Sequence, residues 1–381
     1  TSRITWVSDD IARTVSAASY LTDWNVFDWF QTSRNDFLAG TLTNASTTGT
    51  GIGADIILNT TQSWVNAGGS LFTHASSTDF SGGTFATTSF VGTGIVADIE
   101  LATSTTWSSR TSPTTNDLKS IFMVSASDVW AVGLGGTIIH WDGNSWSATT
   151  SPVANDLYGL HMVSASDGWV GGASGKILQW NGSSWSQFVD TGTEVWRAVF
   201  MVSSTDGWIV GEGGNIRRWN GTAWNTVTSP TGQNINSVYC VSTSDCWAAA
   251  SAGQILQWNG TSWSTFVDTG TETWNDVWMV STSDGYIVAN GGAIRRWNGT
   301  AWNAITSPTA ENLNSVSFTS ASDGWIAGDG GKILHWDGSS WTENLDTGTD
   351  TWIAVHAIGA TQAWIVGNSG KIRFYAATAY A

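Results

Sequence analysis

The sequence predicts an all-β fold, a seven-bladed β-propeller, from three observations. Aspartate recurs every 39 residues, at Asp128, Asp167, Asp206, Asp245, Asp284 and Asp323, and the next step reaches Gln362. Two aromatic series keep the same step, one from Trp130 to Trp364 and one from Trp141 to Tyr375. Each repeat contains four short β-branched and aromatic runs separated by Gly, Asn, Asp and Ser, which is the pattern of a propeller blade.

The third repeat gives the order of elements within a blade. We expect an inner strand over 196–202, a second strand over 207–211, a third over 215–219 and an outer strand over 222–227. The stretch WNGTAWN, found at 219–225 and 297–303, contains the last hairpin. Its Asn-Gly pair, replaced by Asp-Gly in two blades, predicts a type I′ turn in which both central residues have positive φ.

The ring is predicted to close through a strand that precedes the first repeat. An outer-strand tryptophan recurs at Trp146, Trp185, Trp224, Trp263, Trp302 and Trp341, and one step earlier at Trp107. The last repeat stops near Tyr375, before an outer strand of its own. We therefore expect residues near 105–111 to complete the seventh blade, so that the ring keeps no open edge between its ends.

Composition restricts the partners. The chain of 381 residues carries a net charge of −16 with only 12% charged residues, so nucleic acid and anionic membranes would be repelled. It has no apolar run of the roughly 18 residues that a transmembrane segment requires. A removed signal peptide would explain the start at Thr1, as would a trimmed chain, and we expect an extracellular or cell-surface location. Cys240 and Cys246 are either a local disulfide or two buried thiols.

Repeats such as DGWIVGEGGNIRRWNGTAW (206–224) and SDGWIAGDGGKILHWDGSSW (322–341) carry a family resemblance. They are similar to blades of Asp-box-like (BNR-like) propellers, particularly of the photosystem II assembly-factor-like family, over roughly residues 105–375. The resemblance implies the fold, and it covers enzymes, assembly factors and surface proteins alike. The hairpins end in Gly-Thr-Ala-Trp or Gly-Ser-Ser-Trp where the strict Asp-box has Gly-x-Thr-Trp, so no family ligand or metal role is carried over.

Two types of blade alternate with a period of 78 residues. A DTGT segment precedes the third, fifth and seventh blades, and an inner-strand tryptophan there accompanies a third-strand arginine. The pairs are Trp196 with Arg217, Trp274 with Arg295, and Trp352 with Arg373. Because both positions are aliphatic in the other blades, we expect cation–π pairs inside these three blades. The alternative is a functional arginine cluster.

The N-terminal part divides into an arm (1–35) and two β-repeat modules (36–64 and 79–107) that align at an offset of 43, ahead of the propeller at 105–381. The Thr/Gly-rich modules resemble those of large bacterial surface proteins. In the arm, Ser8 could cap a short helix, or TSRITWV could be a strand. The arm also supplies a candidate subunit contact, formed by Trp6, Trp24, Phe27, Trp29 and Phe30.

Catalytic patterns are not found. A sialidase-type site needs three converging arginines, a tyrosine nucleophile with its glutamate and an aspartate. Here three of the arginines occupy a strand position coupled to tryptophan, and the few tyrosines replace repeat tryptophans or hydrophobic residues. The five histidines lack metal-ligand spacing. We therefore expect no enzyme, cofactor or metal. One polar series in the loops before the inner strands could accept sugar hydroxyls or hold a cation: Asn116, Asn155, Glu194, Gln233, Glu272, Glu311 and Asp350. We favour the interpretation that these side chains cap their own loops, and that the Asp128 series binds turn amides.

Six sequons follow the same turn chemistry or lie in the N-terminal repeats. They begin at Asn44, Asn59, Asn181, Asn220, Asn259 and Asn298. We interpret the hairpin sequons mainly as products of the turn, with glycosylation as the alternative. The sequence thus predicts a non-enzymatic extracellular structural or adhesive protein, a subunit of a surface assembly or filament that associates with itself or with other surface proteins. The alternatives are a carbohydrate-binding propeller and an assembly-factor-like protein-binding propeller.

Overall fold

The structure is a computed structural model, and it describes residues 2–8, 11–17 and 105–377. Contacts between Cα atoms divide the chain into two units, Thr1–Ser104 with Thr378–Ala381, and Thr105–Ala377. In the first unit β1 (Ser2–Ser8) and β2 (Ile11–Ala17) form an antiparallel pair, with Ser8 opposite Ile11. The helix alternative from Ser8 is therefore wrong. The β-branched residues of this stretch, such as Ile4, Val7 and Val15, favour extended backbone.

The other N-terminal predictions lie outside the described residues. These are the first β-repeat module (36–64), the second up to residue 104, the sequons at Asn44 and Asn59, and four residues of the predicted subunit contact. Those four are Trp24, Phe27, Trp29 and Phe30, while the fifth, Trp6, belongs to β1.

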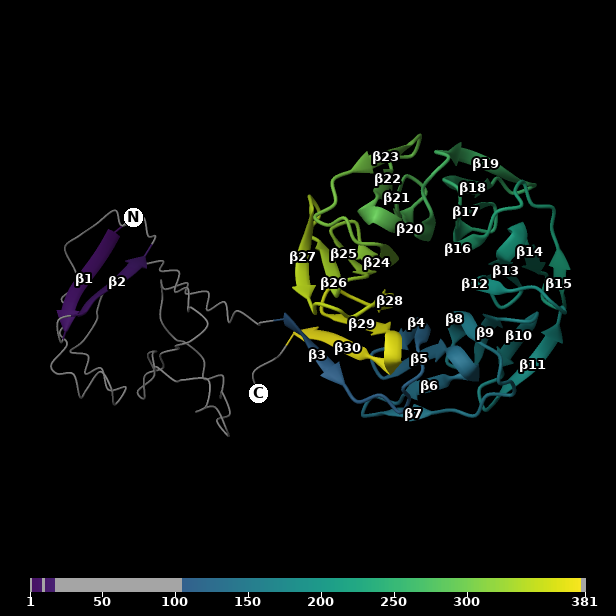
Figure 1. Cartoon of the computed structure of the whole chain (residues 1–381), viewed down its shortest axis with the longest axis horizontal. Coiled ribbons are helices and arrows are strands. Elements are labelled where there is room, and N and C mark those ends of the chain that lie inside the picture. Colours follow the sequence, from purple (N-terminus) through teal and green to yellow (C-terminus); the bar gives the residue numbers. More distant parts are fainter. Residues whose placement is uncertain (1, 9–10, 18–104, 378–381) are drawn as a thin grey trace, which may run out of the picture. The chain divides into compact units, whose positions relative to one another are not determined.

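Seven four-stranded antiparallel sheets form the ring of the second unit, as predicted (Figure 1). The first three blades are β4 (Leu118–Ser125), β5 (Asp128–Gly133), β6 (Ile138–Trp141), β7 (Trp146–Ala148); β8 (Leu157–Ser164), β9 (Asp167–Gly172), β10 (Lys176–Trp180), β11 (Trp185–Asp190); and β12 (Trp196–Ser203), β13 (Asp206–Gly211), β14 (Ile216–Trp219), β15 (Trp224–Thr226). The next two are β16 (Ile235–Ser242), β17 (Asp245–Ala250), β18 (Gln254–Trp258), β19 (Trp263–Asp268); and β20 (Trp274–Ser281), β21 (Asp284–Ala289), β22 (Ile294–Trp297), β23 (Trp302–Ile305).

Blade 6 contains β24 (Leu313–Ser320), β25 (Asp323–Gly328), β26 (Lys332–Trp336) and β27 (Trp341–Asp346). Blade 7 contains β28 (Trp352–Ala357), β29 (Gln362–Gly367), β30 (Ile372–Ala377) and, as its outer strand, β3 (Thr105–Arg110). Short 3-10 turns occur only in the odd-numbered blades among residues 105–377: η1 (Leu134–Gly136), η2 (Glu212–Gly214), η3 (Asn290–Gly292) and η4 (Asn368–Gly370). These turns recur with the 78-residue period of the sequence, and they include blade 1, which lacks the DTGT segment.

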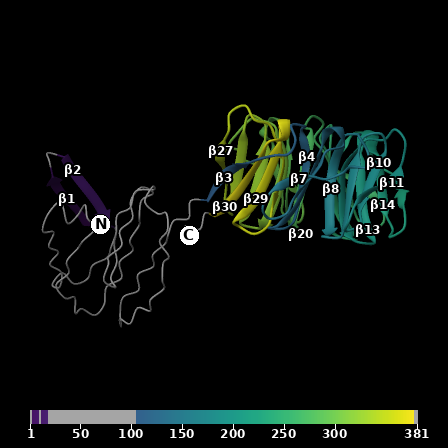
Figure 2. The ribbon, with the colours of Figure 1, turned by 90° about the horizontal axis from the view of Figure 1, so that it is seen from below.

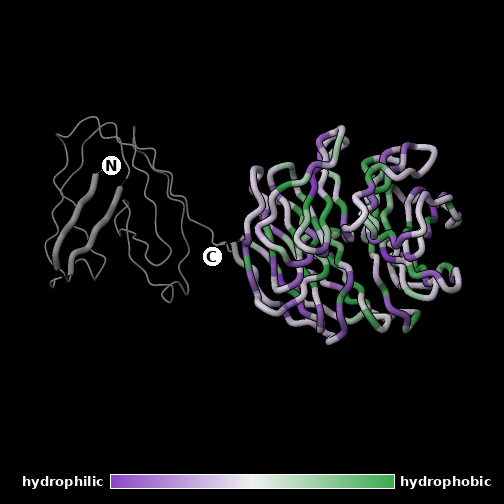
Figure 3. The backbone as a smooth tube through the Cα atoms, turned by 45° about the horizontal axis from the view of Figure 1, so that its top comes forward, coloured by the Kyte–Doolittle hydropathy of each residue, from purple (hydrophilic) through white to green (hydrophobic). Residues whose placement is uncertain are grey.

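The strands run between the two faces of the ring (Figure 2). We call the face on which the inner strands begin the entry face; it carries the loops between blades, such as 191–195. The opposite face, which carries hairpins such as 220–223, is the hairpin face. Hydrophobic strand segments alternate with hydrophilic loops throughout the ring (Figure 3), so the core lies between and within the sheets.

Adjacent blades are joined by clusters of three aromatic rings. The Trp169 ring centroid lies 4.7 Å from that of Trp219 and 5.3 Å from that of Trp224, the latter edge-on. The same cluster recurs at the other interfaces: Trp130 with Trp180 and Trp185, Trp208 with Trp258 and Trp263, Trp247 with Trp297 and Trp302, Tyr286 with Trp336 and Trp341, and Trp364 with Trp141 and Trp146. Full burial of one such ring contributes about 1.5–3 kcal/mol, so the repeated tryptophans are architectural.

The ring closes through β3, as predicted. β3 pairs with β30 in a register that sets Trp107 opposite Tyr375. Both rings pack on Trp325 of blade 6, at centroid distances of 5.1 and 4.4 Å. The Trp107 indole N–H donates to Asn344 Oδ1 at 3.1 Å. The interface made by the two ends of the ring therefore reproduces the aromatic cluster of the others.

The hairpin in WNGTAWN is not a type I′ turn. Gly221 has φ +89°, whereas Asn220 is absent from the positive-φ residues of the described chain. Asn220 Oδ1 instead accepts the backbone N–H groups of Thr222 and Ala223, at 3.0 and 2.8 Å, and the Thr222 hydroxyl at 2.9 Å. Asn and Asp exchange here because either supplies that oxygen, and the glycine is kept because it alone adopts positive φ. The asparagines of all four hairpin sequons are exposed.

The aspartates before the second strands do not bind the turn amides, so this prediction was wrong. Asp206 forms a two-pronged ion pair with Arg218 on the third strand, at 2.7 and 2.9 Å, and Asp128 pairs with His140 at 2.8 Å. The turn amide is taken by a serine hydroxyl, as in the 3.2 Å bond from Thr205 N–H to Ser203 Oγ. A serine two residues before this amide occurs in blades 1 to 6, and it was the competing acceptor that the pattern contained.

Cys240 and Cys246 form a disulfide between the inner and second strands of blade 4. They lie directly opposite each other in the β16–β17 register. At the equivalent positions of blade 3 the sulfur of Met201 packs over Gly207. The disulfide therefore occupies a place that a methionine and a glycine fill elsewhere in the ring.

Candidate functional site

The predicted loop series lies on the entry face, and several of its members are held locally. Glu194 pairs with Arg217 at 3.2 Å and Glu272 with Arg295 at 3.7 Å. Asp350 pairs with Lys371. Asn116 Nδ2 donates to Leu134 O and Thr137 Oγ1, at 3.2 and 2.9 Å. The other three are the half-buried Asn155 and the exposed Gln233 and Glu311.

The three arginines of the alternating blades also make local contacts. The guanidinium carbons of Arg217, Arg295 and Arg373 lie 5.6, 5.6 and 5.7 Å from the ring centroids of Trp196, Trp274 and Trp352. Each arginine donates to the carbonyl oxygen of an outer-strand tryptophan, as Arg217 does to Trp224 O at 3.4 Å. A hydrogen bond from Thr269 holds the pKa of Glu272, beside Arg295, below its usual range. These side chains bind the loops and outer strands to the inner strands.

A cavity of about 300 Å³ occupies the central channel and is lined by the inner strands of all seven blades. Its mouth lies three residues beyond the predicted series in each repeat. The residues at this level, the mouth level, are Lys119, Tyr158, Arg197, Asn236, Asn275, Asn314 and Ile353. In every inner strand the pairing with the second strand skips the second residue, as it skips Arg197 between Trp196 and Ala198. A bulge of this kind turns consecutive residues to the same side, and hence two levels face the channel.

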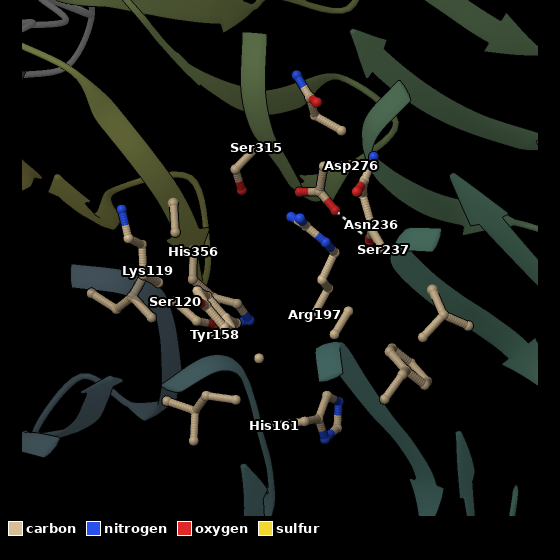
Figure 4. A pocket seen from close by; sticks show the side chains of 18 of the residues that line it. Lys119, Ser120, Tyr158, His161, Arg197, Asn236, Ser237, Asp276, Ser315 and His356 are labelled. Carbon is tan, nitrogen blue, oxygen red and sulfur yellow. Dashed lines mark hydrogen bonds between the residues drawn. The ribbon is translucent and has the colours of Figure 1, made fainter. Parts of the chain in front are cut away.

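The second level, the chamber level, is made of small side chains with one exception. It consists of Ser120, Gly159, Ala198, Ser237, Asp276, Ser315 and Ala354. The absence of bulk at these positions leaves the space that forms the cavity (Figure 4). Asp276 is the carboxylate of this level, and Figure 4 shows it beside Ser237 and Ser315.

Asp276 joins three blades. Its Oδ1 accepts the Ser237 hydroxyl of blade 4 at 2.6 Å, and its Oδ2 accepts the Val316 N–H of blade 6 at 2.9 Å. Burial raises the pKa of Asp276, and the hydrogen bonds from Ser237 and Val316 oppose that increase. Ser315 occupies the same place in blade 6 and accepts the Val355 N–H of blade 7 at 3.3 Å. This level therefore links neighbouring inner strands as well as lining the cavity.

Aromatic rings form the floor of the cavity. The floor consists of Phe122, His161, Phe200, Tyr239, Trp278 and His356, one from each blade except blade 6, where the residue is the buried Ser317. Neighbouring centroids lie 4.5–5.7 Å apart around the ring. The sequence contained a signal for this floor, because His161 and His356 share one phase of the repeat, but the loop series was preferred. The floor and the mouth were both missed as site residues.

Both floor histidines are neutral near pH 7. Burial lowers the pKa of His161 to about 3, with a further contribution from the His356 charge, and burial lowers the pKa of His356 to about 4. His356 Nδ1 accepts the Met123 N–H at 3.4 Å, a bond that requires an unprotonated nitrogen. The floor is consequently uncharged and aromatic under ordinary conditions.

We expect the propeller to lose stability as the pH falls below about 6.5. The unfolded chain protonates its histidines there, whereas the folded chain resists until the pH approaches 4 and then 3. For His356 alone the loss would reach about 3 kcal/mol well below pH 4, since one pKa unit corresponds to about 1.4 kcal/mol. Urea unfolding of the wild type and of the double variant His161→Phe/His356→Phe, between pH 7 and 4.5, measures this. The variant should have a flatter profile, and parallel profiles would contradict the assignment.

Among residues 105–377 and the β1–β2 pair, no group of three or more His, Cys, Asp or Glu side chains is placed to hold a metal ion. No helix in that part of the chain is long and apolar enough to cross a membrane. The channel contains a cavity with a polar mouth, one chamber-level carboxylate and an aromatic floor, which is the composition of a binding site.

Comparison with known proteins locates the fold. No family model and no curated protein matches the sequence. Among solved structures, YCF48 bound to a D1 peptide is similar with a TM-score of 0.61 at 17% identity, over 71% of this chain and 94% of that one. YCF48 from Cyanidioschyzon merolae gives 0.60 at 16% identity, over 71% and 98%. The WD40 propeller domain of Doa1 gives 0.59 at 12% identity, over 71% and 97%.

These likenesses are of the fold, a seven-bladed propeller. One of the similar propellers was solved with a bound peptide.

Proposed function

We propose that this chain is a non-enzymatic, extracellular protein-binding propeller that works as a component of a cell-surface assembly. The observation that carries the proposal is the channel cavity, whose mouth level, next to the entry face, has a polar side chain from every blade except blade 7. Propellers of the same fold include one that holds a peptide. A channel mouth built from seven strands offers separate positions to successive groups of an extended segment.

The extracellular part of the proposal is supported by the disulfide of Cys240 and Cys246, because such bonds persist in oxidising compartments. The excess of acidic residues, 21 against 11 basic ones between residues 105 and 377, disfavours nucleic acid as a partner. The carbohydrate-binding alternative, which rested on the loop series, is less favoured because Glu194, Glu272 and Asp350 are already paired with cations.

Photo-crosslinking tests the proposal. Tyr158 lies at the mouth on the entry face, and Asn220 lies exposed on the hairpin face. The full chain, with p-benzoylphenylalanine in place of Tyr158, is irradiated with extracellular material of its source. We expect adducts with a defined protein, or with a second copy of the chain if it assembles with itself, identified by mass spectrometry.

The matched control carries the crosslinker in place of Asn220 and should give few adducts. Equal adducts from both positions would contradict a site at the mouth. An absence of protein adducts, together with binding of the same chain to a glycan array, would favour the carbohydrate-binding alternative.

A further inference from the structure

One wall of the channel mouth presents hydrogen-bond acceptors. Three asparagines of blades 4 to 6 each donate a side-chain N–H to a backbone carbonyl oxygen of the following blade. The bonds run from Asn236 to Trp274 O at 2.8 Å, from Asn275 to Leu313 O at 2.8 Å and from Asn314 to Trp352 O at 2.9 Å. A backbone carbonyl only accepts, so the amide nitrogen must face it, and the amide oxygen is left on the other side. Figure 4 shows the Asn236 oxygen on the side of the open space. By the same reasoning we expect the Asn275 and Asn314 oxygens to face the channel beside that of Asn236.

Asp276 stands one residue below Asn275, so its carboxylate extends the same acceptor wall. No cation lies within 4.0 Å of it among the described residues. The two cations of the mouth are engaged elsewhere: Lys119 pairs with Asp117 at 3.1 Å and Arg197 with Glu212 at 2.5 Å. Its hydrogen bonds stabilise the carboxylate, but a buried charge without a counter-charge is costly. Asp276 therefore has no cation in direct contact, although Lys119 and Arg197 line the same cavity.

The floor below the wall suits an organic cation. The faces and edges of Phe122, Phe200, Tyr239 and Trp278 surround the channel axis, and the two floor histidines are neutral near pH 7. Aromatic rings attract ammonium groups and also pack against the methylenes that carry them. The acidic excess of the propeller raises the local concentration of cations near its surface.

We propose that the channel cavity binds a primary alkylammonium group, delivered by a lysine side chain of the bound protein segment. The ammonium donates to Asp276 and to the amide oxygens of the mouth, and the methylenes lie against the aromatic floor. A carboxylate would be repelled by this wall, and a neutral sugar would leave Asp276 without its counter-charge. The lysine as the source rests on the proposed protein-binding function, while the chemistry of the cavity does not.

The test uses two small probes on the full chain. Nα-acetyl-lysine N-methylamide carries the ammonium, and Nα-acetyl-norleucine N-methylamide has the same methylenes without it. Calorimetric titration should show that the lysine probe binds at least about tenfold more tightly, which corresponds to about 1.4 kcal/mol. Equal affinities, or binding of neither probe at millimolar concentration, would overturn the proposal.

Two variants test whether the ammonium group binds at Asp276. Asp276→Ser introduces the residue found at Ser120, Ser237 and Ser315, and Ser315 shows that a serine here still accepts the amide of the next blade. It should weaken the lysine probe about tenfold and leave the norleucine probe unchanged. Asp142→Asn, in a hairpin of the other face, removes the same charge and should change neither affinity. An equal loss in both variants would mean that only the net charge matters, which contradicts the site.

Ser120→Asp decides the question if Asp276→Ser fails to fold. It places a second carboxylate at the chamber level of blade 1 and should tighten binding of the lysine probe. Unchanged affinity would count against the cavity as the ammonium site. Failure here is distinct from failure of the proposed function: protein adducts at position 158 without any preference for the lysine probe would refute the ammonium site alone.

Discussion

Trp107→Ala should destabilise the propeller more than Trp224→Ala does, although the two side chains are equally buried, at 7% and 6% exposure. Either change leaves a large cavity in an aromatic cluster, and such substitutions cost about 3–5 kcal/mol. Trp224 belongs to β15, which a short hairpin holds beside β14. Trp107 belongs to β3, whose partner β30 lies more than 260 residues away along the chain, so a weakened β3 leaves the ring altogether.

Urea unfolding followed by tryptophan fluorescence measures both variants in the full chain. The Trp107→Ala variant should also expose β30 and the rings of Tyr375 and Trp325 before the rest of the ring unfolds, which hydrogen exchange on these strands would detect. Equal destabilisation by the two substitutions, with no early exchange in β30, would show that closure does not depend on β3.

Gly159→Val should destabilise the protein by about 3 kcal/mol or more, through overpacking against backbone. A Cβ atom at Gly159 would lie 2.7 Å from the Ala198 Cα and 2.9 Å from the Val199 nitrogen, both in the inner strand of blade 3. Neither atom can move without separating blades 2 and 3. Local propensity predicts the opposite sign, because valine favours strands and glycine does not. The sign of the effect therefore separates tertiary packing from propensity.

The control is Gly232→Ala, in an exposed loop where an added Cβ meets nothing within 4 Å. Its effect should stay within about 0.5 kcal/mol. Thermal and urea unfolding of the two variants give the comparison. A stabilised or unchanged Gly159→Val protein would mean that the inner strands approach less closely than the structure indicates.

The repeat made most of the fold predictable. Each blade is a set of antiparallel strands joined by short turns, so its strand order follows from local residue choice, and 39-residue spacing then counts the blades. The closing strand was predictable for the same reason: Trp107 keeps the phase of Trp146 and Trp224 although it lies before the first repeat. Trp196 and Arg217 are both replaced by aliphatic residues in the other type of blade, and this correlated change predicted a contact. In the structure the Arg217 guanidinium carbon lies 5.6 Å from the Trp196 ring centroid.

Predictions that depended on backbone detail were less successful. The turn in WNGTAWN has positive φ at Gly221 alone, because the Asn220 side chain replaces a backbone turn with its own hydrogen bonds. Asp206 binds Arg218, which is twelve residues away in the sequence. Asp206 begins the second strand, and strand pairing sets Arg218 opposite Trp208, two residues further along that strand. The hydrogen-bond partners of Asn220 and Asp206 were both present in the sequence. Several other donors and acceptors lie nearby in each case, and the repeat pattern alone did not show which of them would bond.

The sequence by itself determined the number of blades, the order of their strands, the aromatic clusters and the way the ring closes, because these follow from local periodicity repeated seven times. Only the tertiary structure decided which residues face the channel. A bulge in every inner strand turns Asn275 and Asp276 to the same side, and seven strands converging on one axis make a mouth, a chamber and an aromatic floor from residues far apart in the chain. The candidate site is a property of that convergence, which no single repeat encodes.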